Sequence, residues 1–233
     1  MNSWPTDPPE RDRDLRSLLH DAAAGRFPTE SLTTTHLPSP SSPTDAVLAF
    51  FGHHVIASDV DAEFVLRWTN RDPFALADVR FHAALAEKLG TKPGIYDAVF
   101  ASIGCGYSPV DAGVLESSDR THPRVVRAHI YRDPASLRVF TDPTGAGLLV
   151  MGRGLAGRME AAYEVDVAAR GRGLGRRLIE AARLLAPAGE PVFLQISPGN
   201  VWSMKALMGQ PGWSPVGSEI LFLRAASPDD ALD

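Results

Sequence analysis

Apolar and polar positions follow two periods along this chain, and most of the apolar runs are short. Short apolar or alternating runs are typical of strands, whereas apolar residues spaced three and four apart are typical of helices. The runs that predict strands are residues 46–58 (broken at Gly52), 95–102, 125–131, 137–141, 147–151, 155–167 and 191–196. The stretches that predict helices are residues 11–27, 74–89 and 174–186. A further short helix is predicted to end near residue 69, with Asp59 or Asp61 as its N-cap. This order predicts an α/β (α+β) protein.

The helix predicted at residues 174–186 has the clearest amphipathic period. Leu174, Leu178 and Leu185 lie on one face, and the opposite face is charged. Pro187 ends the helix, because proline cannot continue it. We therefore expect one face of this helix to pack on the sheet and the other to meet solvent.

The composition changes along the chain and predicts its domain organisation. Residues 28–44 (PTESLTTTHLPSPSSPT) are rich in Pro, Ser and Thr, and we expect a linker without regular structure there. The predicted segments are a disordered or linker region with a short helix at 1–44, an N-terminal α/β region at 45–120, a second domain at 121–225 and a tail at 226–233. The first half is either a small separate domain, which we favour, or the front of one expanded domain.

A glycine-rich loop in front of the helix at 174–186 is the most informative feature. Residues 161–167 (AAYEVDV) have the pattern of a strand, and residues 170–175 (RGRGLG) follow. Glycines let the backbone approach a phosphate, and a helix N-terminus presents free N–H groups and a partial positive charge. The loop therefore predicts a pyrophosphate site. It is not a Walker A loop, because the Gly-Lys-Ser/Thr ending is missing.

Residues 165–175 (VDVAARGRGLG) resemble the acyl-CoA signature of the GNAT superfamily of N-acyltransferases, with Val167 where proline is usual. The resemblance continues at the strand 191–196 and at residues 200–203 (NVWS), where family members have an Asn-x-x-Ala/Ser helix. Residues 212–213 (GW) stand one residue later than the family's Gly-Phe pair. The resemblance implies a GNAT-type mixed, mostly antiparallel sheet with a V-shaped CoA-binding splay, preceded by a small α/β N-terminal region. It also implies acetyl-CoA as the cosubstrate, no metal, and an acetyltransferase domain at 121–225.

The resemblance also assigns roles to individual residues of the cofactor site. The main chain of the CoA-binding strand would hold the pantetheine arm and the acetyl oxygen, and Asn200 would orient CoA or the strand. The residues expected to bind the cofactor are Val165, Val167, Arg170, Gly171, Arg172, Gly173, Leu174, Gly175, Arg176, Asn200 and Ser203.

Two carboxylates on the same strand are the candidate general bases of the reaction. Glu160 and Glu164 lie on one face of a regular strand, because side chains alternate between its two faces. The alternative for each is a surface carboxylate that pairs with an arginine such as Arg158.

The general acid is less clearly marked. Family members often have a proton-donating tyrosine seven residues after the asparagine, and this chain has Leu207 there. Ser203 and Tyr163 are the alternative donors.

A second glycine pattern, at residues 152–157 (GRGLAG), matches the G-x-G-x-x-G of dinucleotide-binding folds. The next predicted strand and the glycine-rich loop at residues 170–175 follow it almost at once, which leaves too little room for a crossover helix. We therefore interpret it as a hairpin turn between two antiparallel strands.

Charge and cysteine content limit the partners. The net charge of −5 argues against nucleic acid, whereas residues 153–183 hold seven arginines against four acidic residues, a local charge of +3 that suits an anionic cofactor. The single cysteine, Cys105, excludes an internal disulfide and a cysteine-based zinc cluster. No apolar window has the length of a membrane span and no signal peptide is evident, so we expect a cytoplasmic protein without a membrane partner.

Two functions from different classes follow from the sequence. The first is an N-acetyltransferase that moves an acetyl group from acetyl-CoA to a primary amine by direct attack in a ternary complex. The acceptor would be a small-molecule amine or a peptide amine, and the acidic N-terminal half hints at a cationic one. The second is an acyl-CoA-binding sensor or partner-binding module with little or no turnover. A homodimer is compatible with the sequence.

Overall fold

The computed structural model describes residues 9–29, 33–50, 52–70, 72 and 74–224. Within them, ten strands form one sheet. The strands are β1 (Thr33–Leu37), β2 (Thr44–Phe50), β3 (His53–Ala57), β4 (Pro93–Ile103), β5 (Leu115–Ser117), β6 (Arg138–Thr141), β7 (Gly147–Arg153), β8 (Met159–Val165), β9 (Pro191–Ile196) and β10 (Ser214–Leu223). The helices are α1 (Arg13–Ala23), α2 (Ala62–Thr69), α3 (Val79–Lys88), α4 (Pro123–Tyr131), α5 (Leu174–Leu185) and α6 (Val201–Leu207).

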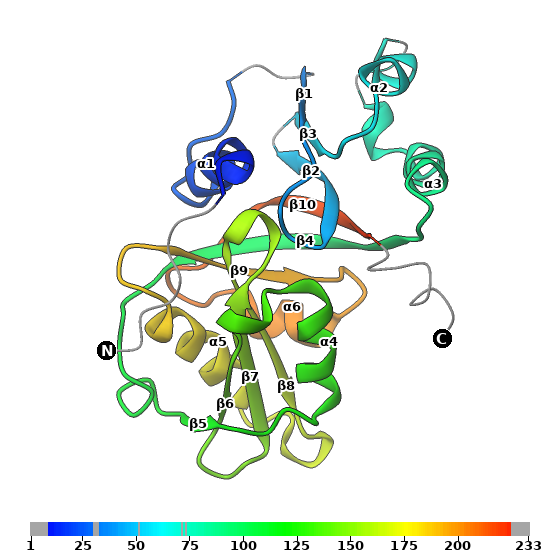
Figure 1. The fold of residues 1–233 in the computed structure, drawn as a ribbon. Helices are drawn as coiled ribbons and strands as arrows, with labels where there is room; N and C mark the ends of the chain where they lie inside the picture. The colour runs from blue at the N-terminus through cyan, green and yellow to red at the C-terminus, as the bar shows by residue number, and fades with distance from the viewer. Residues whose placement is uncertain (1–8, 30–32, 51, 71, 73, 225–233) are drawn as a thin grey trace.

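The strand order is β1-β3-β2-β10-β4-β9-β8-β7-β6-β5, and the sheet is strongly twisted (Figure 1). Only two neighbouring pairs, β1 with β3 and β8 with β9, are parallel. All other described neighbours are antiparallel. The predicted class, a mixed and mostly antiparallel sheet in an α/β protein, is confirmed.

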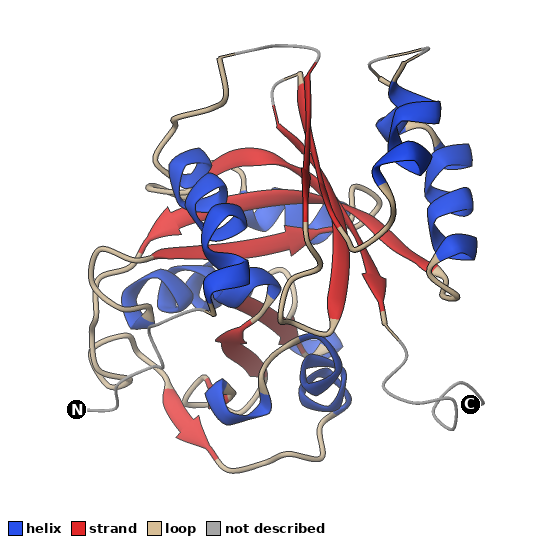
Figure 2. Cartoon of the chain, turned by 45° about the horizontal axis from the view of Figure 1, so that its top comes forward, coloured by secondary structure: helices blue, strands red, loops and turns tan. Residues whose placement is uncertain are grey.

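Helices cover both faces of the sheet (Figure 2). On one face, α5 packs on β7 and β8 with α6 beside it, and α2 and α3 pack on β2, β3 and β10. On the other face, α1 covers the central strands, and α4 packs on β7 through Val125 and Ala128. The predicted amphipathic helix is α5, whose apolar side is buried in the largest core cluster.

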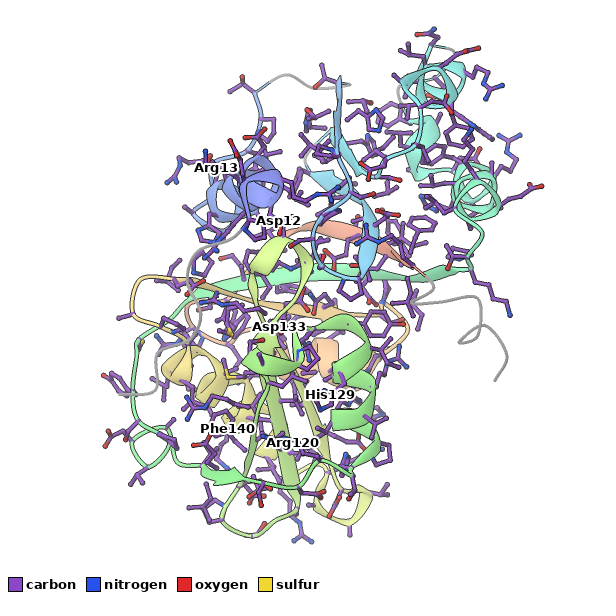
Figure 3. The ribbon with its side chains drawn as sticks, viewed as in Figure 1. Asp12, Arg13, Arg120, His129, Asp133 and Phe140 are labelled. Carbon is purple, nitrogen blue, oxygen red and sulfur yellow. The ribbon has the colours of Figure 1, made fainter. Side chains whose placement is uncertain are left out.

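The segment expected to be a linker contains a strand, so that expectation was wrong for β1. Three β-branched threonines extend along the edge of β3, from Thr33 opposite His53 to Leu37 opposite Ala57. The following residues are also fixed, because the Ser41 N–H donates to the buried Asp12 carboxylate at 2.7 Å. Figure 3 labels Asp12 at the start of α1. Within the region 1–44 that was expected to be disordered or a linker, residues 1–8 and 30–32 lie outside the described residues. The predicted tail at 226–233 also lies outside them.

The prediction of a strand at residues 125–131 was wrong, because these residues belong to the helix α4. His122 caps its N-terminus by accepting a hydrogen bond from the Arg124 N–H at 3.1 Å, and Pro123 occupies the first helical position. Val125 and Ala128, three residues apart, are the buried positions, so the apolar period is helical.

The predicted domain boundary near residue 120 falls within a single sheet. β4, from the first half, lies between β9 and β10 and pairs with both. β10, from the end of the chain, also pairs with β2. The two predicted regions therefore share neighbouring strands, and the independent folding of two domains stays a prediction.

The glycine pattern at residues 152–157 is a hairpin between β7 and β8, as predicted. Gly154 is required by a close approach, because a Cβ there would lie 2.2 Å from the Glu160 carboxyl carbon. The absence of a side chain at Gly154 therefore makes room for the buried carboxylate of Glu160.

Candidate active site

β8 and β9 separate at the centre of the sheet. They pair in parallel only from Met159 to Ala161, opposite Val192 to Leu194. From Ala162 to Val165, β8 continues along β7 but has no partner on its β9 side within the described strands. β9 meanwhile continues along β4 to Ile196. The predicted V-shaped splay is thus present, and it leaves the backbone N–H and C=O groups of the β8 edge available to a ligand.

The glycine loop joins the open end of β8 to the N-terminus of α5. Gly173 precedes the helix with φ +79° and provides no side-chain cap. The first-turn N–H groups of a helix lack partners inside it, so those of α5 are available to an anion. Leu174 is buried in the core, so only its main chain can serve a ligand. Arg170 folds back on the strand and donates to the Val165 carbonyl at 3.1 Å.

The remaining loop arginines lie at the surface around this helix start. Arg172 is exposed, and its carbonyl accepts a hydrogen bond from Arg177 at 3.4 Å. Arg176 and Arg177 line a hollow of about 490 Å³ beside the first turn of α5. Gly175 lies against β8, where a Cβ would meet the Tyr163 ring at 3.4 Å. The structure therefore gathers the predicted loop residues around one helix N-terminus, and their role in binding stays a prediction.

Val167 does not lie on β8, the strand on which it was expected from the sequence. β8 ends at Val165, and Val167 begins a 3-10 turn (Val167–Ala169) with 76% of its surface exposed. The chain turns here because the Asp166 N–H bonds to the Ala146 carbonyl and the Ala169 N–H returns to Asp166. Of the two valines expected to bind the cofactor, only Val165 therefore contributes main chain to the edge of β8.

Asn200 and Ser203 lie at the start of α6, across the splay from β8. The Asn200 side chain caps this helix and accepts a hydrogen bond from the Ser203 N–H at 3.2 Å. Leu207, at the position of the usual tyrosine, is 2% exposed and packs in the core. Tyr163 of β8 lines a pocket at the splay together with Asn200 and Ser203, and its side chain lies beside Ser203. Its hydroxyl is buried without a hydrogen bond of normal geometry in the described chain, and burial raises its pKa.

A pocket of about 380 Å³ lies at the splay and reaches both faces of the sheet. The strand registers assign its side chains to these faces. Glu160 opposes Phe193 on β9, and Phe193 opposes Ala101 on β4, four residues from Asp97. Glu160 and Asp97 therefore lie on the α4 face, whereas Tyr163 lies on the α5 and α6 face. The pocket thus joins two chemically different sides.

Glu160, the first predicted base, is held in a buried ion-pair network. It is 3% exposed and accepts from Arg158 at 2.8 Å, from Arg132 at 3.3 Å and from the Leu155 N–H at 3.2 Å. Arg158, fully buried, also forms two hydrogen bonds with Glu219, at 2.6 and 2.8 Å. Burial alone would raise the pKa of Glu160, but Arg158 and Arg132 outweigh it and the pKa is lowered. A carboxylate so fully paired is a weak proton acceptor, and its contacts favour a structural role.

Glu164, the second predicted base, is more open. Its side chain is 42% exposed and pairs with Arg124 of α4 at 3.2 Å. Both Glu164 and Glu160 lie on the α4 face, as the alternation of side chains predicted. Each is paired with an arginine, but only Glu164 is the surface carboxylate of the alternative interpretation, because Glu160 is buried.

Asp97 of β4 is the carboxylate that sequence reasoning missed. It lines the pocket, makes no hydrogen bond or ion pair within the described residues, and lies directly opposite Glu219 of β10. Burial and the neighbouring Glu219 charge raise its pKa from 3.8 to about 6, against the opposing effect of Arg127. A single acid within the apolar run 95–102 was the available signal, because a strand core seldom holds an acid without a reason.

A larger hollow of about 690 Å³ lies near the turn before α1, the C-terminal end of α3 and the start of β2, away from the splay. Its charged side chains pair with one another. The pairs are Arg11 with Asp59, Lys88 with Asp61, and Arg224 with Asp45. This hollow has mutually neutralised walls, so the pocket at the splay is the better candidate site.

The described residues contain no group of three or more His, Cys, Asp or Glu side chains that could hold a metal ion. Over the same part of the chain, no helix has both the length and the apolar character needed to cross a membrane.

No family model matches this chain, and no curated protein matches it. Several solved structures are similar in fold. A GNAT-family protein from Novosphingobium aromaticivorans is 16% identical, with 55% of this chain and 63% of that chain covered and a TM-score of 0.40. A GNAT-family acetyltransferase from Colwellia psychrerythraea is 11% identical, with 61% and 62% covered and a TM-score of 0.36. A GCN5-related N-acetyltransferase from Sphaerobacter thermophilus is 12% identical, with 78% of each chain covered and a TM-score of 0.35.

This chain spans slightly less than two thirds of the length of the first two of these proteins. At such identities and TM-scores the similarity does not assign an activity. The functional assignment therefore rests on the geometry of the site.

Proposed function

We propose that this protein is a GNAT-type N-acetyltransferase that uses acetyl-CoA and acetylates an amine by direct attack in a ternary complex. The observation that carries the proposal is the splay between β8 and β9, with an uncapped helix N-terminus at its mouth and a pocket through its centre. These features fit the three parts of an acyl-CoA. The N-terminus of α5 would receive the pyrophosphate, the free edge of β8 would bind the amide groups of the pantetheine arm, and the pocket would hold the acetyl thioester.

The two faces of the pocket divide the proton transfers between them. Acetyl-CoA supplies a thioester, whose C–S bond is replaced by a C–N bond to the acceptor. Asp97, on the α4 face, takes the proton that the amine nitrogen gives up, and its raised pKa suits a base that works near neutral pH. Tyr163, on the α5 and α6 face, supplies a proton to the departing sulfur from a hydroxyl that lies beside Ser203 and has no hydrogen bond of normal geometry within the described residues.

Glu160 and Glu164, the bases suggested by the sequence, take other roles in this proposal. Glu160 keeps Arg132, which lines the pocket, and the buried Arg158 in place. Glu164 holds Arg124 at the start of α4, where Arg124 lines the pocket.

An acyl-CoA-binding sensor is the second candidate function, and one observation favours it. The position of the family's usual proton donor holds Leu207, which is buried in the core and offers no polar group. A sensor would bind acetyl-CoA as tightly as an enzyme but would release no thiol in the presence of an amine.

The experiment that separates these functions combines binding with turnover. Acetyl-CoA affinity is measured by calorimetry, and thiol release is followed with a panel of amines in the same preparation. The enzyme predicts both binding and thiol release, and the sensor predicts binding alone. Absence of acetyl-CoA binding would contradict both.

A further inference from the structure

The charged side chains on the α4 face of the pocket are not all neutralised. Arg124 pairs with Glu164 at 3.2 Å, and Arg132 pairs with Glu160 at 3.3 Å. These pairs account for two of the three arginines that α4 and its C-terminal end contribute to the lining. The third, Arg127, forms no ion pair within the described residues.

Arg127 is positioned by its own helix. It follows Arg124 by three residues, so both lie on the side of α4 that faces the pocket. Its guanidinium lies 5.9 Å from the centre of the Tyr131 ring, which also lines the pocket. Stacking on an aromatic face leaves the edges of a guanidinium free to donate two parallel hydrogen bonds.

Asp97 is the corresponding anion on the opposite wall of the same pocket. It lies on β4, has no ion-pair partner in the described chain, and is close enough to Arg127 for that positive charge to lower its pKa. The pocket therefore presents one unpaired anion and one unpaired cation to whatever enters it. The two charges together leave the pocket without the net negative potential that would select a simple cationic amine.

We propose that the acceptor is a free amino acid, a small zwitterion whose amine faces Asp97 and whose carboxylate is bound by Arg127. The inference rests on the proposed function and names the substrate class of that same site. The volume supports a small molecule, because about 380 Å³ must hold both the acceptor and the acetyl end of the cosubstrate. The planar guanidinium matches a carboxylate, to which it can donate two hydrogen bonds at once.

The transfer is balanced with these groups. Asp97 takes one proton from the ammonium and passes it to solvent, and the free amine attacks the thioester carbon to form the C–N bond. Asp97 then takes the second nitrogen proton as the C–S bond breaks, and Tyr163 protonates the departing sulfur and recovers its proton from solvent. The product is an N-acetyl amino acid, which keeps its carboxylate and has lost its positive charge. It no longer attracts Asp97, which favours its release.

The test uses binding as a readout that does not depend on turnover. Calorimetry with the full chain saturated with CoA measures the affinity of each common L-amino acid and of its C-terminal amide, which lacks the carboxylate. We expect at least one amino acid to bind about tenfold or more tightly than its amide, the size of one charged hydrogen-bonded contact. Arg127→Gln should remove this preference.

Arg120→Gln is the matched control, because Arg120 lies outside the pocket lining and donates to the Ser117 carbonyl at 3.2 Å. Figure 3 labels Arg120 in the segment before α4. The control should retain the preference for the amino acid.

Each outcome separates the inference from the proposed function. Thiol release with amides or simple amines as efficient as with amino acids would overturn the inference and leave the acetyltransferase standing. Amino-acid binding that depends on Arg127, without thiol release, would support the amino-acid site but contradict the enzyme, and with it the role of the amino acid as acceptor. Absence of amino-acid binding to the CoA-saturated chain would overturn the inference, whatever the result for acetyl-CoA.

Discussion

Replacement of Asp97 by asparagine tests whether the ionised Asp97 side chain lowers the free energy of unfolding of the protein. Asp97 faces the buried Glu219 in register and has a pKa raised from 3.8 to about 6. When folding raises the pKa of a carboxyl group, the folded state is favoured while that group is protonated. This contribution is complete below the pKa that the group has in the unfolded chain, and it is lost as the pH rises through the pKa that the group has in the folded protein. The difference between 3.8 and about 6 corresponds to about 3 kcal/mol at most, at about 1.4 kcal/mol for each pH unit.

The Asp97→Asn protein carries no charge at this position and escapes that penalty. We expect it to exceed the wild type in free energy of unfolding by up to about 3 kcal/mol near pH 8, and by roughly half as much near pH 5. Urea unfolding followed by tryptophan fluorescence at both pH values measures this, with the exposed Asp111→Asn as the control. An advantage of equal size at both pH values, or a loss of stability near pH 8, would refute the reasoning.

The same substitution also tests catalysis. We expect acetyl transfer to fall by about 10²- to 10⁴-fold, the usual contribution of a positioned base, while acetyl-CoA affinity is retained. In the wild type, kcat/KM should rise as the pH passes through about 6, the pKa of Asp97. Full activity of the variant would exclude Asp97 as the base.

The remaining predictions concern the other face of the pocket and the buried network. Tyr163→Phe should lower kcat by about 10²-fold with unchanged acetyl-CoA affinity. Its thermal midpoint should stay the same or rise, because the lost hydroxyl had no hydrogen-bond partner in the described chain; unchanged kcat would exclude this hydroxyl as the donor. Arg158→Met should lower the free energy of unfolding by about 3–5 kcal/mol, because it leaves Glu160 and Glu219 buried with their main cation removed. The exposed Arg26→Met, which breaks a surface pair with Asp21, should change it by less than about 1 kcal/mol in urea unfolding, and equal losses in both variants would contradict the role of burial.

The cofactor half of the site could be predicted from the sequence because its signal is local. A strand, two glycines and an amphipathic helix are adjacent in the chain, and β8, Gly173 and α5 occur where the pattern placed them. The hairpin at residues 152–157 was predictable for the same reason.

The acceptor half depends on contacts between residues far apart in the sequence. Asp97 enters the pocket because β4 inserts between β9 and β10, a pairing that no local pattern indicates. Arg127 enters because residues 123–131 are a helix, although their valines and isoleucine favour a strand by propensity. The burial of Glu160 depends likewise on Arg132, 28 residues away, and on the Arg158 and Glu219 pair.

The most direct test of the central claim is acetyl-CoA binding by calorimetry to the wild type, to Gly173→Trp and to Gly189→Trp. Both glycines are exposed and have φ +79°, so the two substitutions impose the same backbone strain. Gly189 lies in the turn between α5 and β9 and has open space around it. We predict that the wild type and Gly189→Trp bind acetyl-CoA and that Gly173→Trp does not. Equal affinity in all three proteins, or absence of binding to the wild type, would contradict the placement of the cofactor at the N-terminus of α5.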